Sequence, residues 1–310
     1  MAQLLNPIEL EISSQISTLK LFDENLVVGC IDGSVRVLDL VTQKWKSEIE
    51  AHTLGVNEVL WDRCGKYIFS CADDGTTQIR DISGQLMTTL FGHTNYVQSL
   101  SIDPKNLLIL SGGNDCSVFL WDIRNISEIN SFFHIHRETI TSVDFSKDSS
   151  VFLTASYDGT MHVWDTMSLN SIKTISYSKN APISRAKFVG DNGLVASACL
   201  TNKIYMWDIE EIKSLPLRTY TGHKNERFKC QIQVSDDNQS IWSGSEDGNL
   251  YGWDLQSQQV INTIRLAEEN AIVHAFDIKS DLIVYTTHNK GETKDTGSLV
   301  ISKFEKIENA

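Results

Sequence analysis

Histidine, aspartate and serine or threonine recur together in this chain, and these residue types form the catalytic triad of many hydrolases. In a triad the imidazole takes the proton of the hydroxyl group, and the carboxylate orients the imidazole. The sets are His52 with Ser70 and Asp74, His93 with Ser111 and Asp115, His136 with Thr154 and Asp158, and His223 with Ser243 and Asp247. Taken singly, each set has the composition of a site for acyl transfer.

The repetition of these sets favours a structural role. A catalytic site is built once, whereas a structural device recurs in each unit of a repeat protein. We therefore expect buried networks in which the aspartate accepts a hydrogen bond from the histidine and the histidine reaches the hydroxyl group. A tryptophan completes the expected network at Trp121, Trp164 and Trp253. The competing hydrolase hypothesis predicts an activity that is lost when one histidine is replaced.

The units are marked by a Trp-Asp dipeptide at residues 121–122, 164–165, 207–208 and 253–254, with degenerate copies at 38–39 and 80–81. From Asp39 onward the terminal aspartates are 42, 41, 43, 43 and 46 residues apart. This is the period of a four-stranded propeller blade. His223 precedes its terminal aspartate by 31 residues where the other histidines precede theirs by 29, so the sixth unit holds two additional residues.

A seventh unit lacks a convincing fourth strand. Residues 272–278, 282–287 and 299–304 have the pattern of three strands, and residues 8–12 alternate apolar with acidic side chains. We expect residues 5–12 to pair with this blade and close the ring, which removes an exposed sheet edge. The predicted fold is an all-β, seven-bladed WD-repeat propeller that spans residues 1–310 as a single domain. The expected blades lie at about 14–48, 49–89, 90–132, 133–176, 177–219, 220–264 and 265–306.

The composition argues against several functions. A formal net charge of −13 opposes a surface that neutralises phosphates, so direct nucleic-acid binding is not expected. The six cysteines lack a C-x-x-C motif, which argues against a secreted disulfide framework. No signal peptide or long apolar run is recognised, so we expect a chain in a reducing compartment without membrane contact. Phosphate-cradle and nucleophile-elbow motifs are missing, so neither an enzyme nor a cofactor is predicted.

His134 and His136 lie on one side of an extended segment and could bind zinc with a third ligand such as Glu138. His136 already has a place in an expected network, and no cysteine lies at ligand spacing. No metal site is therefore predicted.

Blades two to six resemble the propeller subunit of COMPASS-type histone H3 lysine-4 methyltransferase complexes. The stretches that carry the resemblance are 51–59, 92–97, 156–159 and 219–226, of which Lys-Asn-Glu at 224–226 is the most diagnostic. The resemblance implies a non-catalytic, nuclear scaffold in a hetero-oligomer, which bridges a second WD-repeat propeller and the catalytic SET-domain chain. A histone H3 tail or nucleosome would be met through the complex. A cytoplasmic signalling scaffold of the same fold is the alternative.

In that family the channel mouth holds an arginine of a partner peptide between two aromatic rings. The matching positions are Gln98 and Gln231, which offer no aromatic face, so we expect arginine capture to be weak or lost. The other matching mouth positions are Gly55, Asp73, Tyr157 and Phe228.

The family's second contact is a groove between blades five and six that receives a segment of the other propeller subunit. The matching positions are Asp191, Leu194, Met206, Val234 and Gln256. Three apolar side chains flanked by two polar ones suit an extended peptide with one or two apolar anchors. Ordinary blade packing explains Met206 and Val234 equally well. Residues 288–298 form an enlarged polar loop to which the sequence assigns no role.

Overall fold

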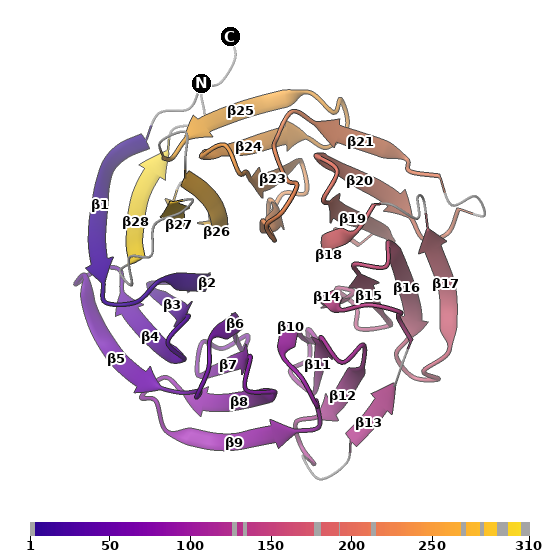
Figure 1. Ribbon diagram of the computed structural model, residues 1–310, viewed down its shortest axis with the longest axis horizontal. Coiled ribbons are helices and arrows are strands. Elements are labelled where there is room, and N and C mark those ends of the chain that lie inside the picture. Colours follow the sequence, from indigo (N-terminus) through magenta and orange to yellow (C-terminus); the bar gives the residue numbers. More distant parts are fainter. Residues whose placement is uncertain are drawn as a thin grey trace.

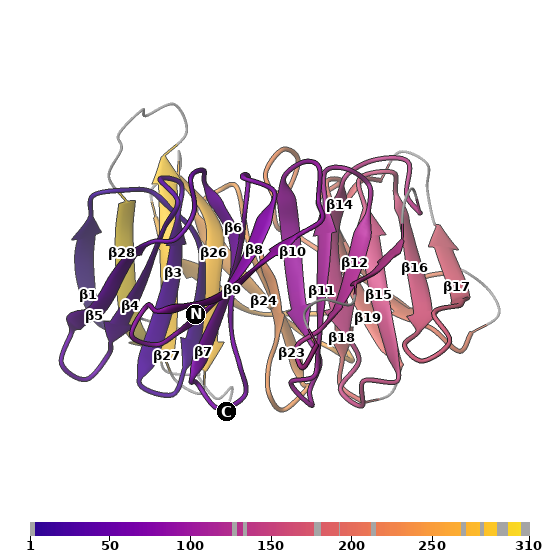
Figure 2. The same ribbon diagram turned by 90° about the horizontal axis from the view of Figure 1, so that it is seen from below.

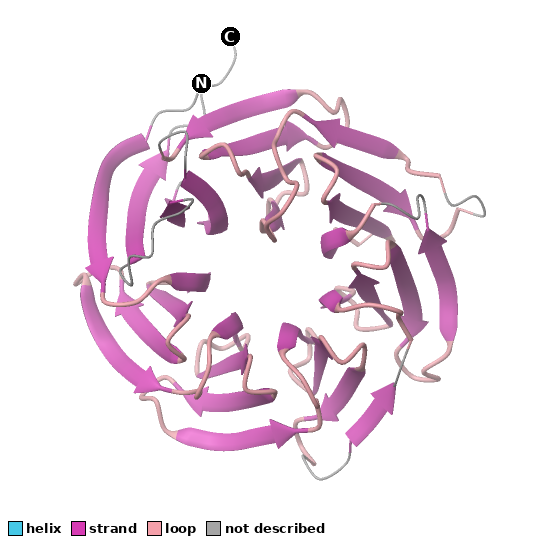
Figure 3. Cartoon of the chain, in the orientation of Figure 1, coloured by secondary structure: helices cyan, strands magenta, loops and turns pink. Residues whose placement is uncertain are grey.

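Seven four-stranded antiparallel sheets surround one axis in the computed structural model (Figures 1 and 3). The structure describes residues 4–125, 129–132, 135–176, 181–191, 193–211, 215–267, 271–279, 282–289 and 297–304. All regular structure in these ranges is β, so the predicted seven-bladed propeller is confirmed. No helix in the described part of the chain is long and apolar enough to span a membrane.

Each sheet runs from an inner strand beside the axis to an outer strand at the rim. The inner strands lie close to the direction of the axis, and the outer strands are tilted along the rim (Figures 1 and 2). The first three sheets are β2 (Ile16–Phe22), β3 (Asn25–Cys30), β4 (Ser34–Asp39) and β5 (Lys44–Glu50); β6 (Val56–Trp61), β7 (Tyr67–Ala72), β8 (Thr76–Asp81) and β9 (Leu86–Phe91); and β10 (Val97–Ile102), β11 (Leu108–Gly113), β12 (Val118–Asp122) and β13 (Ile129–Phe132).

The next three sheets follow the same order around the ring. They are β14 (Ile140–Phe145), β15 (Val151–Ser156), β16 (Thr160–Asp165) and β17 (Ser171–Ser176); β18 (Ile183–Val189), β19 (Leu194–Cys199), β20 (Lys203–Asp208) and β21 (Arg218–Thr221); and β22 (Ile232–Val234), β23 (Ser240–Gly244), β24 (Asn249–Asp254) and β25 (Val260–Arg265).

The seventh sheet joins the two ends of the chain. It consists of β26 (Ala271–Lys279), β27 (Leu282–Asn289), β28 (Gly297–Phe304) and, at the rim, β1 (Leu4–Ile12). Figure 1 shows the indigo β1 beside the yellow β28, and the register places Leu10 opposite Leu299. The predicted closure by the N-terminal strand is therefore confirmed.

The core lies between neighbouring sheets. Val27 and Val35 of the first sheet, for example, pack against Val56 and Val59 of the second, and all four side chains are at most 1% exposed. Middle strands such as β3 are covered on both faces and are almost continuously apolar. The outer strand β5 alternates exposed and half-buried residues, because one of its faces meets solvent.

A β-bulge interrupts six of the seven inner strands near the same end of the ring. Each bulge turns one polar side chain out of the pairing pattern. These side chains are Ser17, Asn57, Gln98, Thr141, Ser184 and His274. Several bond the first carbonyl of the next inner strand: Asn57 Nδ2 to Val97 O at 2.8 Å, Thr141 Oγ1 to Ile183 O at 2.7 Å, and His274 Nε2 to Ile16 O at 2.7 Å.

A second row of bonds crosses the sheet boundaries deeper along the axis. A side-chain oxygen of one inner strand accepts a backbone N–H of the next. The pairs are Glu58 with Leu100 at 2.8 Å, Asp144 with Phe188 at 2.9 Å, Gln233 with Ile278 at 3.0 Å, and Asp277 with Leu21 at 2.7 Å.

Four outer strands end slightly beyond the expected blade boundaries of 48, 89, 219 and 264. They end at Glu50, Phe91, Thr221 and Arg265. The physical reason is that these residues still pair with the neighbouring strand, as Glu50 does with Ser34 and Phe91 does with Thr76. The chain turns toward the axis only after this last pair.

Removal of residues 1–13 should destabilise the whole ring. Ile12 is 2% exposed and shares a core cluster with Ile16 and Leu299, while Ile8 and Leu10 pack against that cluster. Their loss should lower the free energy of unfolding by roughly 5 kcal/mol or more. Thermal melting followed by circular dichroism measures this, with removal of residues 1–3 as the control. A truncated chain that melted like the full-length chain would show that β1 does not hold the ring closed.

Candidate functional site

A cavity of about 520 Å³ opens at the end of the axis where the bulges lie. Ser17, Asn57 and Gln98 line it at the axis, and Glu9 and Glu11 of β1 line it toward the rim. The cavity therefore reaches from the channel mouth outward over the seventh sheet. Its inner and outer ends carry different charges.

A fixed loop of the sixth sheet projects into this cavity. The side chain of Glu246 is buried, and its Oε1 accepts the backbone N–H groups of Glu226 at 2.7 Å, Arg227 at 2.6 Å and Phe228 at 3.1 Å. This carboxylate holds the segment in a tight turn. Phe228 and Lys229 then line the cavity, and Lys229 Nζ donates to Gln98 O of the third sheet at 2.9 Å. Sequence motifs did not identify Glu246 or Lys229, although the two additional residues of the sixth unit were a signal of an irregular loop.

Charged side chains continue down the channel. Arg185 Nη2 lies 2.9 Å from Glu58 Oε1, and both side chains are 7% exposed. Burial disfavours the charge of Glu58, but Arg185, followed by Lys229 and Lys187, holds the pKa of its carboxyl at about 2. Burial, and then the nearby Arg185, lower the pKa of Lys229 to about 7. Burial also lowers the pKa of Lys187.

Only part of the expected mouth forms one site. Gln98 and Phe228 line the cavity, whereas Gly55, Asp73, Tyr157 and Gln231 lie outside its lining. Asp73 Oδ1 instead accepts from Asn57 Nδ2 at 2.7 Å, which orients a bulge side chain that does line the cavity. Gln231 is 9% exposed, and its backbone N–H donates to His274 O at 3.0 Å. The two glutamines therefore do not flank a common ligand space.

The expected groove between the fifth and sixth sheets needs one correction. Met206 is 0% exposed and belongs to the core between these sheets, so it offers no contact surface. Leu194 and Val234 are partly buried against the same core cluster, and Gln256 is exposed. Asp191 pairs with Lys147 at 3.1 Å and lines a different cavity of about 510 Å³ between the fourth and fifth sheets.

The third sheet contains a complete hydrogen-bonded chain. Trp121 Nε1 donates to Ser111 Oγ at 3.0 Å, Ser111 Oγ lies 2.9 Å from His93 Nε2, and His93 Nδ1 lies 3.0 Å from Asp115. Burial alone would raise the pKa of Asp115, but the hydrogen bond from His93 lowers it. The hydrogen bonds all point from donor to acceptor in the same direction, from the indole to the carboxylate. Each bond therefore strengthens the next.

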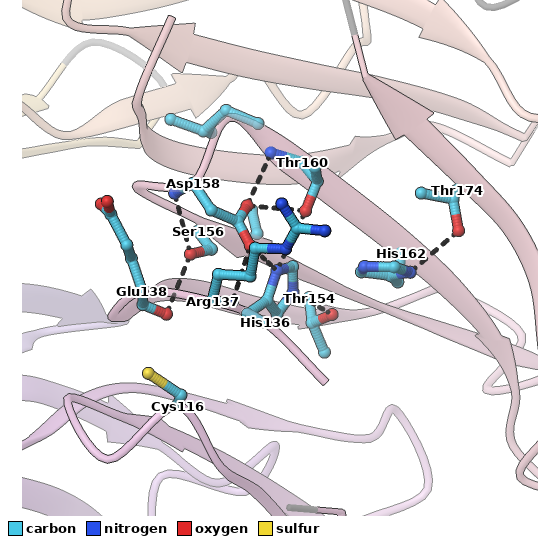
Figure 4. Close-up of polar contacts among 12 residues, drawn as sticks. Cys116, His136, Arg137, Glu138, Thr154, Ser156, Asp158, Thr160, His162 and Thr174 are labelled. Atoms are coloured by element: carbon cyan, nitrogen blue, oxygen red, sulfur yellow. Dashed lines mark hydrogen bonds and ion pairs between the residues drawn. The ribbon is translucent and has the colours of Figure 1, made fainter. Parts of the chain in front are cut away.

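The fourth sheet repeats this arrangement, and Figure 4 shows its His136, Thr154 and Asp158. His136 lies 2.9 Å from Thr154 and 3.2 Å from Asp158, and Trp164 Nε1 donates to Thr154 at 3.2 Å. Ser111 and Thr154 are both 0% exposed, so a substrate carbonyl cannot reach either hydroxyl group. This burial argues against the hydrolase hypothesis.

The second sheet has the histidine bonds without the tryptophan. His52 lies 2.8 Å from Ser70 and 3.0 Å from Asp74. Arg80 stands at the tryptophan position and donates to Gln78 at 3.0 Å instead.

In the sixth sheet the expected network does not form. Neither ring nitrogen of His223 has a hydrogen-bond partner among the described residues. Tyr251 donates to Asp247 at 2.8 Å, Ser243 donates to Gly244 O at 2.8 Å, and Trp253 donates to Thr221 O at 2.9 Å. The physical reason is that the two additional residues displace His223, which packs edge-on against the Trp253 ring at 5.2 Å.

In the described ranges no cluster of three or more metal-ligand side chains occurs. His134, considered above with His136 and Glu138, lies outside the described residues. His136 uses both ring nitrogens in its network, so neither is available to a metal ion.

Matched serine substitutions test the structural role of the network. Ser111→Ala leaves the buried groups of Trp121 and His93 without a partner and should lower the free energy of unfolding by about 2–3 kcal/mol. Ser243→Ala is the control, because this serine is equally buried but, among the described residues, bonds a single carbonyl, and its loss should cost about 1 kcal/mol or less. Urea unfolding measures the free energy of unfolding of both variants. Equal losses in the two variants would show that the network does not stabilise the fold.

Acid should destabilise the fold through His223. Burial lowers the pKa of His223 from its ordinary 6.5 to about 4. Between these values the unfolded chain binds a proton that the folded chain does not, so stability falls as the pH falls from 6.5 toward 4. His223→Phe keeps a ring against Trp253 but cannot be protonated. Between pH 7 and 4.5 the free energy of unfolding of this variant, measured in urea, should fall by roughly 2 kcal/mol less than that of the parent chain. If both chains lost the same free energy over this pH range, His223 would not be the source of the acid destabilisation.

The repeats match a known protein family. The model of the WD domain, G-beta repeat, matches residues 43–81, 84–122, 127–165 and 214–254, about half of the chain. The matches end at the terminal aspartates of the second, third, fourth and sixth units.

Individual relatives match over shorter stretches. The chain is 37% identical over 79 residues to the vacuolar protein sorting-associated protein 41 homolog of Arabidopsis thaliana, which is 26% of this chain and 8% of the relative. It is 33% identical over 79 residues to eukaryotic translation initiation factor 3 subunit I of Lodderomyces elongisporus, which is 25% of this chain and 23% of the relative. It is 30% identical over 102 residues to COMPASS component SWD3 of Saccharomyces cerevisiae, covering 33% and 32%. The chain thus spans a third or less of each of these relatives, and its repeats and seven-sheet ring show that it belongs to the WD-repeat family.

Proposed function

We propose that this chain is a non-catalytic scaffold subunit of a nuclear COMPASS-type, SET-domain histone H3 lysine-4 methyltransferase complex. In this role it bridges a second WD-repeat subunit and the catalytic chain. The observation that carries the proposal is the 30% identity to COMPASS component SWD3. The blade stretches at 51–59 and 219–226 that resemble this class of subunit add support.

The geometry suits a scaffold. WD-repeat propellers generally mediate protein–protein interactions and are generally non-catalytic. A closed ring leaves loops at both ends and outer strands at the rim for partners, and it holds these surfaces at fixed relative positions. Loss of such a subunit lowers methylation by disassembly of the complex, because the subunit contributes no reacting group.

Purification from the native source tests the role directly. A SET-domain chain and a second WD-repeat protein should co-purify with the tagged chain, and depletion of the chain should lower histone H3 lysine-4 methylation. Re-expression should restore it. Companions drawn from translation initiation or vacuolar sorting would instead favour the kinship suggested by the other two relatives.

The groove can be tested with substitutions that respect the core. Leu194→Glu combined with Val234→Glu places two charges where partly buried apolar side chains meet the surface, and it should abolish binding of the second propeller. Met206 is left intact because a charge there would disrupt the core. Met167→Glu is the control, since Met167 is 90% exposed in the turn between β16 and β17 of the fourth sheet. Co-purification measures binding, and melting curves check the fold; unchanged co-purification of a folded double variant would discredit the groove.

A further inference from the structure

We propose that the channel mouth is a carboxylate-binding site that takes an acidic side chain or a free C-terminus of a partner polypeptide through Lys229. The inference deepens the scaffold role proposed above, and it rests on that role only in taking the ligand to be a polypeptide.

Hydrogen bonds hold Lys229 at the mouth of the channel. The loop that carries it is fixed by three backbone bonds to Glu246, and its Nζ donates to Gln98 O at 2.9 Å across the axis. An ammonium group has three N–H donors. Gln98 O is its hydrogen-bond acceptor among the described residues, and no carboxylate in that part of the chain forms an ion pair with it.

The nearest acid of the channel is already occupied. Glu58 receives Arg185 at 2.9 Å, Ser99 Oγ at 2.8 Å and the backbone N–H of Leu100 at 2.8 Å. Arg185 itself keeps a buried Nε without a hydrogen-bond partner. Among the described residues, the charged groups that act on Lys229 are Arg185 and Glu58, so two cationic side chains stand against one carboxylate there. Because burial and Arg185 lower the pKa of Lys229 to about 7, an arriving carboxylate also favours its protonated form.

The cavity that Lys229 lines is basic at the axis and acidic toward the rim. From Lys229 it extends to Glu9 and Glu11, whose side chains are exposed on β1. A volume of about 520 Å³ accommodates one side chain with its flanking backbone. The complementary ligand places its carboxylate at the axis and basic residues over the rim. Phe228, which is 40% exposed, offers an apolar contact beside the entrance.

The same features disfavour a guanidinium group. Gln98 presents no aromatic face, and the ammonium of Lys229 stands within hydrogen-bond distance of its carbonyl. An arginine entering the mouth would meet this charge and Arg185 beneath it. The expected preference is therefore opposite in sign to that of the family the chain resembles.

Selection from a random eight-residue peptide library, with free and amidated C-termini, tests the proposal. The full chain and the Lys229→Met variant are immobilised in parallel. We expect only the parent chain to enrich peptides with an acidic residue or a free C-terminus. The best peptide is then titrated by calorimetry beside its uncharged counterpart. Loss of the peptide carboxylate or of Lys229 should each weaken binding about tenfold or more, and the two losses should not add.

Two variants control the result. Lys224→Met removes a half-exposed lysine near the same loop, 3.7 Å from Glu226 and outside the cavity lining, and it should leave affinity within about twofold. Lys229→Gln keeps a donor without the charge and should behave like Lys229→Met, and melting curves check that both fold. Enrichment by the parent chain of arginine peptides that carry no carboxylate, equal enrichment of acidic peptides by Lys229→Met, or no enrichment over that variant would each overturn the site. Binding of acidic peptides by a chain that co-purifies with other companions would overturn the methyltransferase role and leave the site intact.

Discussion

The inner strand of each sheet has one edge without a strand partner, and the ring depends on satisfying the backbone groups of that edge across the sheet boundary. Apolar packing between sheets is not directional and does not fix their angular positions. The bonds from Asn57 to Val97 O and from Glu58 to Leu100 N do, because each joins a side chain of one inner strand to the backbone of the next. Asp277 repeats the device where the seventh sheet meets the first, at Leu21. Closure by β1 completes the rim, while these bonds complete the axis.

This constraint also determines what the channel contains. Side chains that bond across the sheet boundaries must be polar, whether a bulge displaces them, as at Asn57, or they lie in regular pairing, as at Glu58. Glu58 therefore needs a buried counter-ion, which Arg185 supplies from the fifth sheet. A cation cluster at the centre of an acidic protein thus begins as a structural requirement. The histidine networks are a separate device: they tie the turns of a single sheet together and remain away from the axis.

Repetition made much of this structure predictable. The Trp-Asp period predicted the sheets, and the alternation of residues 8–12 predicted a closing strand that the structure places at Leu4–Ile12. Features that break the repeat were not accessible in the same way. His223, Ser243 and Asp247 have the composition of a network, but two additional residues displace the histidine, and Tyr251 takes the aspartate.

Burial on both faces of a strand was a second limit. Met206 has the right residue type for a groove, yet spacing alone does not show that both faces of its strand are covered. Glu246 and Lys229 depend on a loop without periodicity, and their roles appear only when backbone N–H groups converge on one carboxylate. The parts of the candidate site that the sequence missed are therefore those set by loop geometry.

Burial of Lys229 lowers the stability of the fold, and the hydrogen bonds across the sheet boundaries do not require this residue. Its pKa falls from 10.5 to about 7 in the folded chain. Between these values the unfolded chain binds a proton that the folded chain does not, so the contribution of Lys229 to stability rises with pH and is at its most unfavourable below about pH 7. Arg185 already neutralises Glu58, so the ring does not need this second cation to satisfy a buried acid. A carboxylate from outside would offset the cost by supplying the counter-ion that the described channel lacks. The lowered pKa of Lys229 and its place in the cavity lining thus both point to Lys229 Nζ as the atom that binds a carboxylate.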